Sequence, residues 1–181
     1  IRSGSGAITA SDLLNTGTNS LTVSSSGAVN LLGISSGTLA VTGNGIILNT
    51  NVTTSGAQTY TGAVRLMNSI TIASTGASSA GNNISFSSSI NGTTANTESL
   101  TLNSGTGGTI TVSGQTGTST SLSTLTLTNS NGATFTGAVT TGTSVVIAST
   151  SNGATILFSG ALTTPTLTTA AQGYNLQLLG T

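Results

Sequence analysis

The 181-residue sequence contains no cysteine and no histidine, one proline, and only two basic and two acidic side chains. Without cysteine there are no disulfides and no thiolate metal ligands. Without histidine there is no serine or cysteine nucleophile paired with an imidazole base. Two arginines cannot make a basic surface for nucleic acid, and no apolar run reaches the ~18 residues of a membrane helix. We therefore expect no nucleic-acid partner and no membrane insertion.

Carboxylate chemistry is equally poorly represented. Asp12 and Glu98 are the only acids and stand 86 residues apart, whereas glycoside hydrolysis needs two neighbouring carboxyl groups. We interpret both as solvated surface charges. The glycine-rich stretch 105–108 lacks the lysine of a phosphate-binding loop, which favours a turn. The sequence predicts no enzyme, no metal site and no cofactor.

The residues that are abundant indicate β-structure. The chain has 25 glycines, is rich in Ser, Thr and Asn, and its apolar residues are mainly Val, Ile and Leu. These apolar residues alternate with polar ones over two to four positions, as in Leu21–Val23 and Ile70–Ile72, and Gly, Asn or Ser follow. Such short alternations between turn residues are typical of strands. No segment has helical periodicity over ten residues, so we predict an all-β fold.

One five-residue phrase recurs along the chain. It reads YTGAV at Tyr60–Val64, FTGAV at Phe135–Val139 and FSGAL at Phe158–Leu162, with a looser copy, FSSSI, at Phe86–Ile90. The chain has five aromatic residues, and four of them begin a copy of this phrase. A repeated aromatic in one local frame indicates a repeated structural unit.

The spacing of the phrase favours a solenoid over the alternative, a β-sandwich. The inward-facing core positions recur at intervals of 26, 26, 23 and 23 residues, at Tyr60, Phe86, Val112, Phe135 and Phe158. A solenoid stacks the same apolar side chain on each coil, whereas a sandwich has no reason to repeat one. We predict a single parallel β-helix of roughly seven or eight coils over residues 1–181, or a segment of a longer repeat protein. The register is clearest at 60–164.

The polar residues fit the corners and outer faces of such a solenoid. Between inward positions we expect an outward threonine column, made of Thr22, Thr71, Thr101 and Thr126. We expect positive φ at the Asn-Gly pairs 44–45, 91–92, 131–132 and 152–153. Three glycosylation-type triplets begin at Asn51, Asn83 and Asn91 and are assigned to turns. Arg65 and Glu98 are candidates for a surface ion pair.

The phrases AQTYTGAV at Ala57–Val64 and NGATFTGAV at Asn131–Val139 resemble repeats of large bacterial exoproteins. These are the filamentous-haemagglutinin-like adhesins of two-partner secretion and related autotransporter passengers. The likeness extends over roughly Leu39–Leu162. It implies a right-handed parallel β-helix, export to the surface of a Gram-negative cell, and adhesion or matrix building. The chain begins with Ile1 and no signal peptide, so we expect a processed protein or part of a longer one.

The leading hypothesis is an extracellular adhesive fibre in which copies or neighbouring repeats stack end to end and a surface glycan or receptor binds. The last alternating strand, Asn175–Leu179, is uncharged, and we expect Leu176 and Leu178 to form the axial interface. An ice-binding or other flat-surface-binding solenoid is the alternative, although only Thr126 and Thr128 form a Thr-x-Thr pair in the expected column. A polysaccharide-active enzyme ranks third because there are only two acids.

Overall fold

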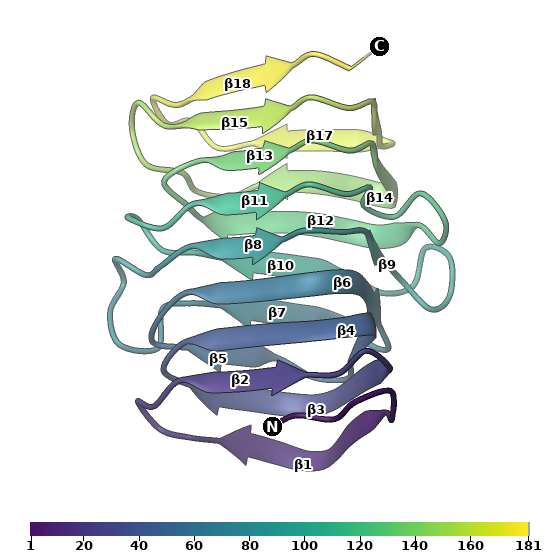
Figure 1. Cartoon of the computed structure of the whole chain (residues 1–181). Helices are drawn as coiled ribbons and strands as arrows, with labels where there is room; N and C mark the ends of the chain where they lie inside the picture. The colour runs from purple at the N-terminus through teal and green to yellow at the C-terminus, as the bar shows by residue number, and fades with distance from the viewer. Residues whose placement is uncertain (181) are drawn as a thin grey trace.

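A computed structural model describes residues 1–180 as one right-handed parallel β-solenoid of about 9 turns. In Figure 1 the chain rises from the N-terminus at the bottom, the near strands run to the right and the far strands run to the left. No helix occurs in the described residues, so none is long and apolar enough to cross a membrane. The predicted fold class is confirmed.

Eighteen short strands make up the coils. They are β1 (Ile8–Asn15), β2 (Leu21–Ser24), β3 (Ala28–Ser36), β4 (Leu39–Leu48), β5 (Val52–Thr54), β6 (Gln58–Leu66), β7 (Ile70–Ala73), β8 (Ile84–Phe86), β9 (Ile90–Asn91), β10 (Leu100–Asn103), β11 (Ile110–Val112), β12 (Leu122–Asn129), β13 (Ala133–Phe135), β14 (Val139–Ile147), β15 (Thr155–Phe158), β16 (Leu162–Thr163), β17 (Thr166–Thr169) and β18 (Asn175–Leu178). All listed pairings are parallel, and each joins one coil to the next.

The strands form three faces around a single core. The aromatic face consists of β2, the first halves of β4 and β6, then β8, β11, β13, β15 and β18. The pocket face begins with the first halves of β1 and β3 and the second halves of β4 and β6, and continues through β9, the start of β14 and β16. The third face contains the ends of β1, β3 and β14 with β5, β7, β10, β12 and β17.

An axial column of large side chains fills the core behind the aromatic face. In coil order it consists of Val23, Val41, Tyr60, Phe86, Val112, Phe135, Phe158 and Leu178. The four aromatic members are at most 1% exposed. Two pairs of rings stack, Tyr60 on Phe86 with centroids 4.6 Å apart and Phe135 on Phe158 with centroids 5.0 Å apart. The five predicted core residues thus share one buried column.

The repeated phrase has a geometric explanation at the corner between the aromatic and pocket faces. Phe135 points inward, Thr136 points outward, and Val139 points inward again on the next face. Gly137 lies against the preceding coil, where an added Cβ would be 2.5 Å from the Gly114 carbonyl oxygen. Real Cβ atoms do not approach a carbonyl oxygen this closely, so the corner requires glycine.

The coil count exceeds the predicted seven or eight because the N-terminal coils are short. Val23, Val41 and Tyr60 are successive members of one column, only 18 and 19 residues apart. β4 and β6 each bend around a corner and contribute to two faces without an intervening loop. Leu48 and Tyr60 therefore lie on different faces of the core, and their 12-residue separation is no interruption of the register.

The prediction that every Asn-Gly pair supplies a positive φ is only half correct. Gly132 and Gly153 have φ of 113° and 77°, but Gly45 and Gly92 are not among the positive-φ glycines. Gly45 lies inside β4 and has strand geometry. Gly92 is required for space, because a Cβ there would lie 2.5 Å from Glu98 Oε2. An Asn-Gly pair in a solenoid therefore does not by itself mark a tight turn.

Candidate functional surfaces

The outer side of the aromatic face bears a regular array of hydroxyl groups. Within each strand the two outward residues flank the inward column member, which gives a hydroxyl-x-hydroxyl pattern. We call the following residues the hydroxyl array: Thr59, Thr61, Ser85, Ser87, Thr111, Ser113, Thr134 and Thr136. These eight residues occupy four consecutive coils without a gap. Thr42 and Ser24 extend one of the two columns towards the N-terminus, and Ser159 extends it towards the C-terminus.

Geometry makes this array flat. The register shifts between neighbouring strands fall elsewhere, for example after Thr42 at a corner of β4 or after Leu102 on the third face. Neighbouring coils of a parallel sheet are about 4.8 Å apart, and alternate residues of a strand about 6.6 Å apart. Of the eight hydroxyls, Ser87 Oγ alone has a recorded bond within residues 1–180, to the Tyr60 carbonyl oxygen at 3.3 Å. The others can therefore bond to an external partner.

The expected threonine column is divided between two faces. Thr71, Thr101 and Thr126 are aligned on the third face, as expected. Thr22 is wrong for that column, because β2 belongs to the aromatic face, where Thr22 is aligned with Ala40. The alternation of each strand identified all four as outward, but it contained no information on which face each strand joins.

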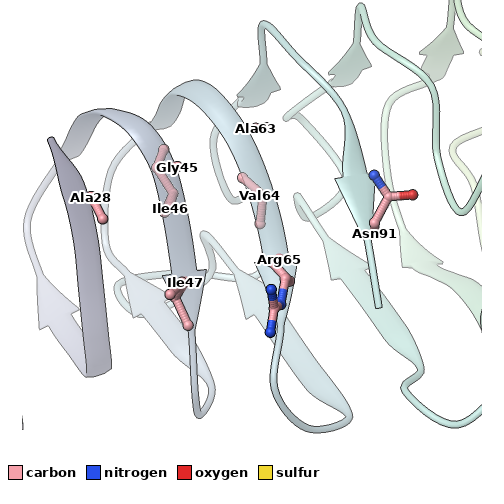
Figure 2. A pocket seen from close by; sticks show the side chains of 8 residues that line it. All are labelled: Ala28, Gly45, Ile46, Ile47, Ala63, Val64, Arg65 and Asn91. Carbon is pink, nitrogen blue, oxygen red and sulfur yellow. The ribbon is translucent and has the colours of Figure 1, made fainter. Parts of the chain in front are cut away.

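A shallow hollow of about 270 Å³ lies on the outer side of the pocket face (Figure 2). It is lined by Ala28, Gly45, Ile46, Ile47, Ala63, Val64, Arg65 and Asn91. Its floor is mainly apolar, and its polar groups are the Arg65 guanidinium and the Asn91 amide. A second hollow of similar size, lined by residues such as Gly17, Thr53 and Gly76, lies at another corner and contains no charged residue.

Glu98 is not the solvated charge that the sequence predicted. It is 4% exposed, and its carboxylate accepts hydrogen bonds from the backbone N–H groups of Thr93 at 3.0 Å and Thr94 at 3.0 Å. The intervening loop folds back over the carboxylate and satisfies it with backbone donors. Asp12 is exposed and accepts a bond from the adjacent Leu13 N–H, as expected of a surface acid.

The expected ion pair between Arg65 and Glu98 is replaced by an indirect link. Arg65 Nε donates to Thr93 Oγ1 at 3.3 Å, while the Thr93 backbone N–H donates to Glu98. No direct pair between the two charges is present within residues 1–180. Thr93 Oγ1 in turn donates to the Leu66 carbonyl oxygen at 2.7 Å, which fixes the loop to the coil below. Sequence separation predicted the proximity but not the intermediary.

A buried glutamine is the polar core residue that sequence reasoning missed. Gln58 is aligned with Leu39 on one side and Ile84 on the other, and is 0% exposed. Its Oε1 accepts a bond from Tyr60 Oη at 2.7 Å, and its Nε2 donates to the Ala73 carbonyl oxygen at 2.8 Å. Burial raises the pKa of the Tyr60 phenol, so Tyr60 remains a neutral donor. The signal was the pairing of a glutamine with the only tyrosine in the repeated phrase.

The last coil has one unpaired edge within the described residues. β17 pairs with β14 and β18 pairs with β15, and neither pairs with a further strand up to residue 180. Leu176 is half-buried against the core, whereas Leu178, the last member of the aromatic column, is 51% exposed. Both residues would be covered by another coil.

No group of three His, Cys, Asp or Glu residues suited to a metal ion occurs among residues 1–180. Comparisons with protein-family models, with curated proteins and with solved structures find no match to this chain. The candidate functional features are therefore the three surfaces described above: the hydroxyl array, the hollow beside Arg65 and the edge of the last coil.

Proposed function

We propose that this chain is a segment of an extracellular structural and adhesive fibre built from parallel β-coils. The observation that supports it is the unbroken in-register stacking of the core column from Val23 to Leu178. With about 4.8 Å per coil, such stacking makes a rod about 40 Å long. Another coil can add to its exposed edge in the same register, whether it belongs to the same polypeptide or to another copy.

Low charge fits this role. Like charges repeated on successive coils would repel each other at ~4.8 Å, and the chain has only two arginines, one Asp and one Glu. The resemblance of the YTGAV and FTGAV phrases to bacterial surface adhesins leads us to propose a location on the outside of a Gram-negative cell. In this proposal the chain is not an enzyme, and a surface glycan or receptor is its external partner.

Blocking the axial edge tests the fibre proposal. The purified chain is expected to form end-to-end filaments by electron microscopy. Leu176→Lys combined with Leu178→Lys should give folded single subunits in sedimentation, because both lysines would be buried by the next coil. Gln177→Lys is the matched control, since Gln177 is exposed and points outward between the two leucines. A parent chain that stays monomeric at high concentration, or a double variant with filaments of normal length, would refute the proposal.

The hydroxyl array supports a second candidate function, binding to a flat periodic surface, for which we propose ice. The array is uncharged, rigid and regular in two directions, and its two repeats are similar to oxygen repeats on faces of ice. Bulky aromatics, on which sugar rings stack, are absent from the array. This favours ordered water over a crystalline polysaccharide.

Two matched pairs of substitutions test this candidate. Thr111→Tyr with Thr134→Tyr raises two rings above the centre of the array on adjacent coils. The control is Thr101→Tyr with Thr126→Tyr, on adjacent coils of the third face. Tyrosine suits strands, so both variants should fold. We expect the parent and the control to partition into growing ice and the array variant to be excluded. Equal behaviour of the two variants, or binding only to crystalline cellulose, would exclude ice binding.

A further inference from the structure

The hollow on the pocket face combines an apolar floor with an arginine that has no acidic partner. The two acids of the chain are engaged elsewhere, Asp12 with the Leu13 N–H and Glu98 with backbone N–H groups of the 93–94 loop. The Arg65 side chain is exposed, and its recorded hydrogen bond within residues 1–180 is the 3.3 Å contact from Nε to Thr93 Oγ1. Its terminal N–H groups are therefore available to an external acceptor.

Small residues create the floor of the hollow. Ala28, Gly45 and Ala63 are aligned on three successive coils, and Ile47 forms an apolar wall next to them. A Cβ added at Gly45 would meet no atom within 4 Å, and Gly45 has no positive φ. The fold therefore does not require glycine here, since a larger residue would occupy the hollow without steric conflict at Cβ. Gly45 keeps the site open.

A second donor stands at the rim. Asn91 is aligned with Arg65 on the following coil. Its Oδ1 accepts the Ser119 N–H at 3.1 Å and the Thr120 N–H at 3.3 Å, which fixes the orientation of the amide. In Figure 2 the amide nitrogen lies on the side of the strand that bears Arg65, and the oxygen lies on the other side. Two donors on adjacent coils thus border one apolar floor.

We propose that this hollow binds a carboxylate borne on a short apolar chain. A guanidinium binds a carboxylate through charge-assisted hydrogen bonds, and the amide of Asn91 supplies a further donor. The apolar part of the ligand covers Ala63 and Ile47 and removes them from water. An amine would meet the positive charge of Arg65, and a sugar would leave its hydroxyls without partners on the apolar floor. The site is independent of the fibre interface and of the hydroxyl array.

Titration with hexanoate, followed through backbone amide shifts in NMR spectra, tests the proposal. We expect saturable shifts at Ala63, Val64 and Asn91 with a dissociation constant in the millimolar range, because an exposed ion pair contributes little and the hollow is shallow. Acetate, which has no apolar chain, and hexylamine, which has the opposite charge, should each bind at least tenfold more weakly. Equal binding of hexanol and hexanoate, or no saturable shift with hexanoate, would refute the proposal.

Two variants separate the charge from the hollow. Arg65→Gln keeps a polar side chain of similar length but removes the charge, and should weaken hexanoate binding at least tenfold. Gly45→Val fills the floor and should abolish binding, while circular dichroism confirms an intact fold. Arg2→Gln is the control for loss of a positive charge, because Arg2 lies on the first coil outside the hollow. Unchanged hexanoate affinity in Arg65→Gln would overturn the inference even if Gly45→Val fails to fold.

Discussion

Replacement of Phe135 by alanine is expected to lower the free energy of unfolding by about 3–5 kcal/mol. The ring is fully buried and stacks on Phe158 with an interplanar angle of 8°. The coils above and below are held by backbone ladders through Val112 and Phe158, so they cannot collapse into the cavity. Most of the cavity cost should therefore remain. Equilibrium denaturant unfolding measures this loss.

Thr134→Ala is the matched control for this prediction. Thr134 precedes Phe135 in the same strand but points outward into the hydroxyl array. We expect its loss to cost less than about 1 kcal/mol, which is the range of strand propensity. If the two substitutions were equally destabilising, the aromatic column would not be the main source of core stability on this face.

Replacement of Glu98 by alanine is expected to cost about 2 kcal/mol, far more than for a surface acid. The carboxylate is the acceptor for the backbone N–H groups of Thr93 and Thr94, and its removal leaves both donors without that partner. Hydrogen bonds to a charged group contribute about 1.5–3 kcal/mol, and the exposure of Thr94 lets water recover part of this. The measurement is again denaturant unfolding.

Asp12→Ala is the comparison for Glu98, because both substitutions remove one carboxylate from a chain with few charges. Asp12 is exposed, and its acceptor role involves only the neighbouring Leu13 N–H. A change within about 0.5 kcal/mol is expected. Glu98→Gln keeps one acceptor oxygen and should fall between the two. Similar small losses for Asp12→Ala and Glu98→Ala would show that the loop is held by other contacts.

The aromatic column was predictable from sequence because each member occupies the same position in a repeated phrase. Phe135 and Phe158 have nearly identical flanks, and an inward residue must recur wherever the coil recurs. Val112 has no aromatic ring, yet the intervals on either side of it identified its position. Local alternation and period are properties of the chain itself, so a single sequence displays them.

The burial of polar residues was not predictable in the same way. Gln58 and Glu98 read as surface residues from their type alone, and each is buried because a partner distant in the fold or across a loop satisfies it. Arg65 was expected to contact Glu98 directly, but Thr93 lies between them. Hydrogen-bond partners in a solenoid come from neighbouring coils, and small changes in coil length alter which residues meet.

The sequence alone determined that strands alternate inward and outward and that one unit repeats, because side-chain direction follows the strand period of two. Only the tertiary structure decided which outward residues become neighbours. Thr111 lies beside Thr134, whereas Thr22 is on a different face from Thr71. The cause is the corners: their bends and insertions set the face on which each strand lies, and that depends on packing between coils.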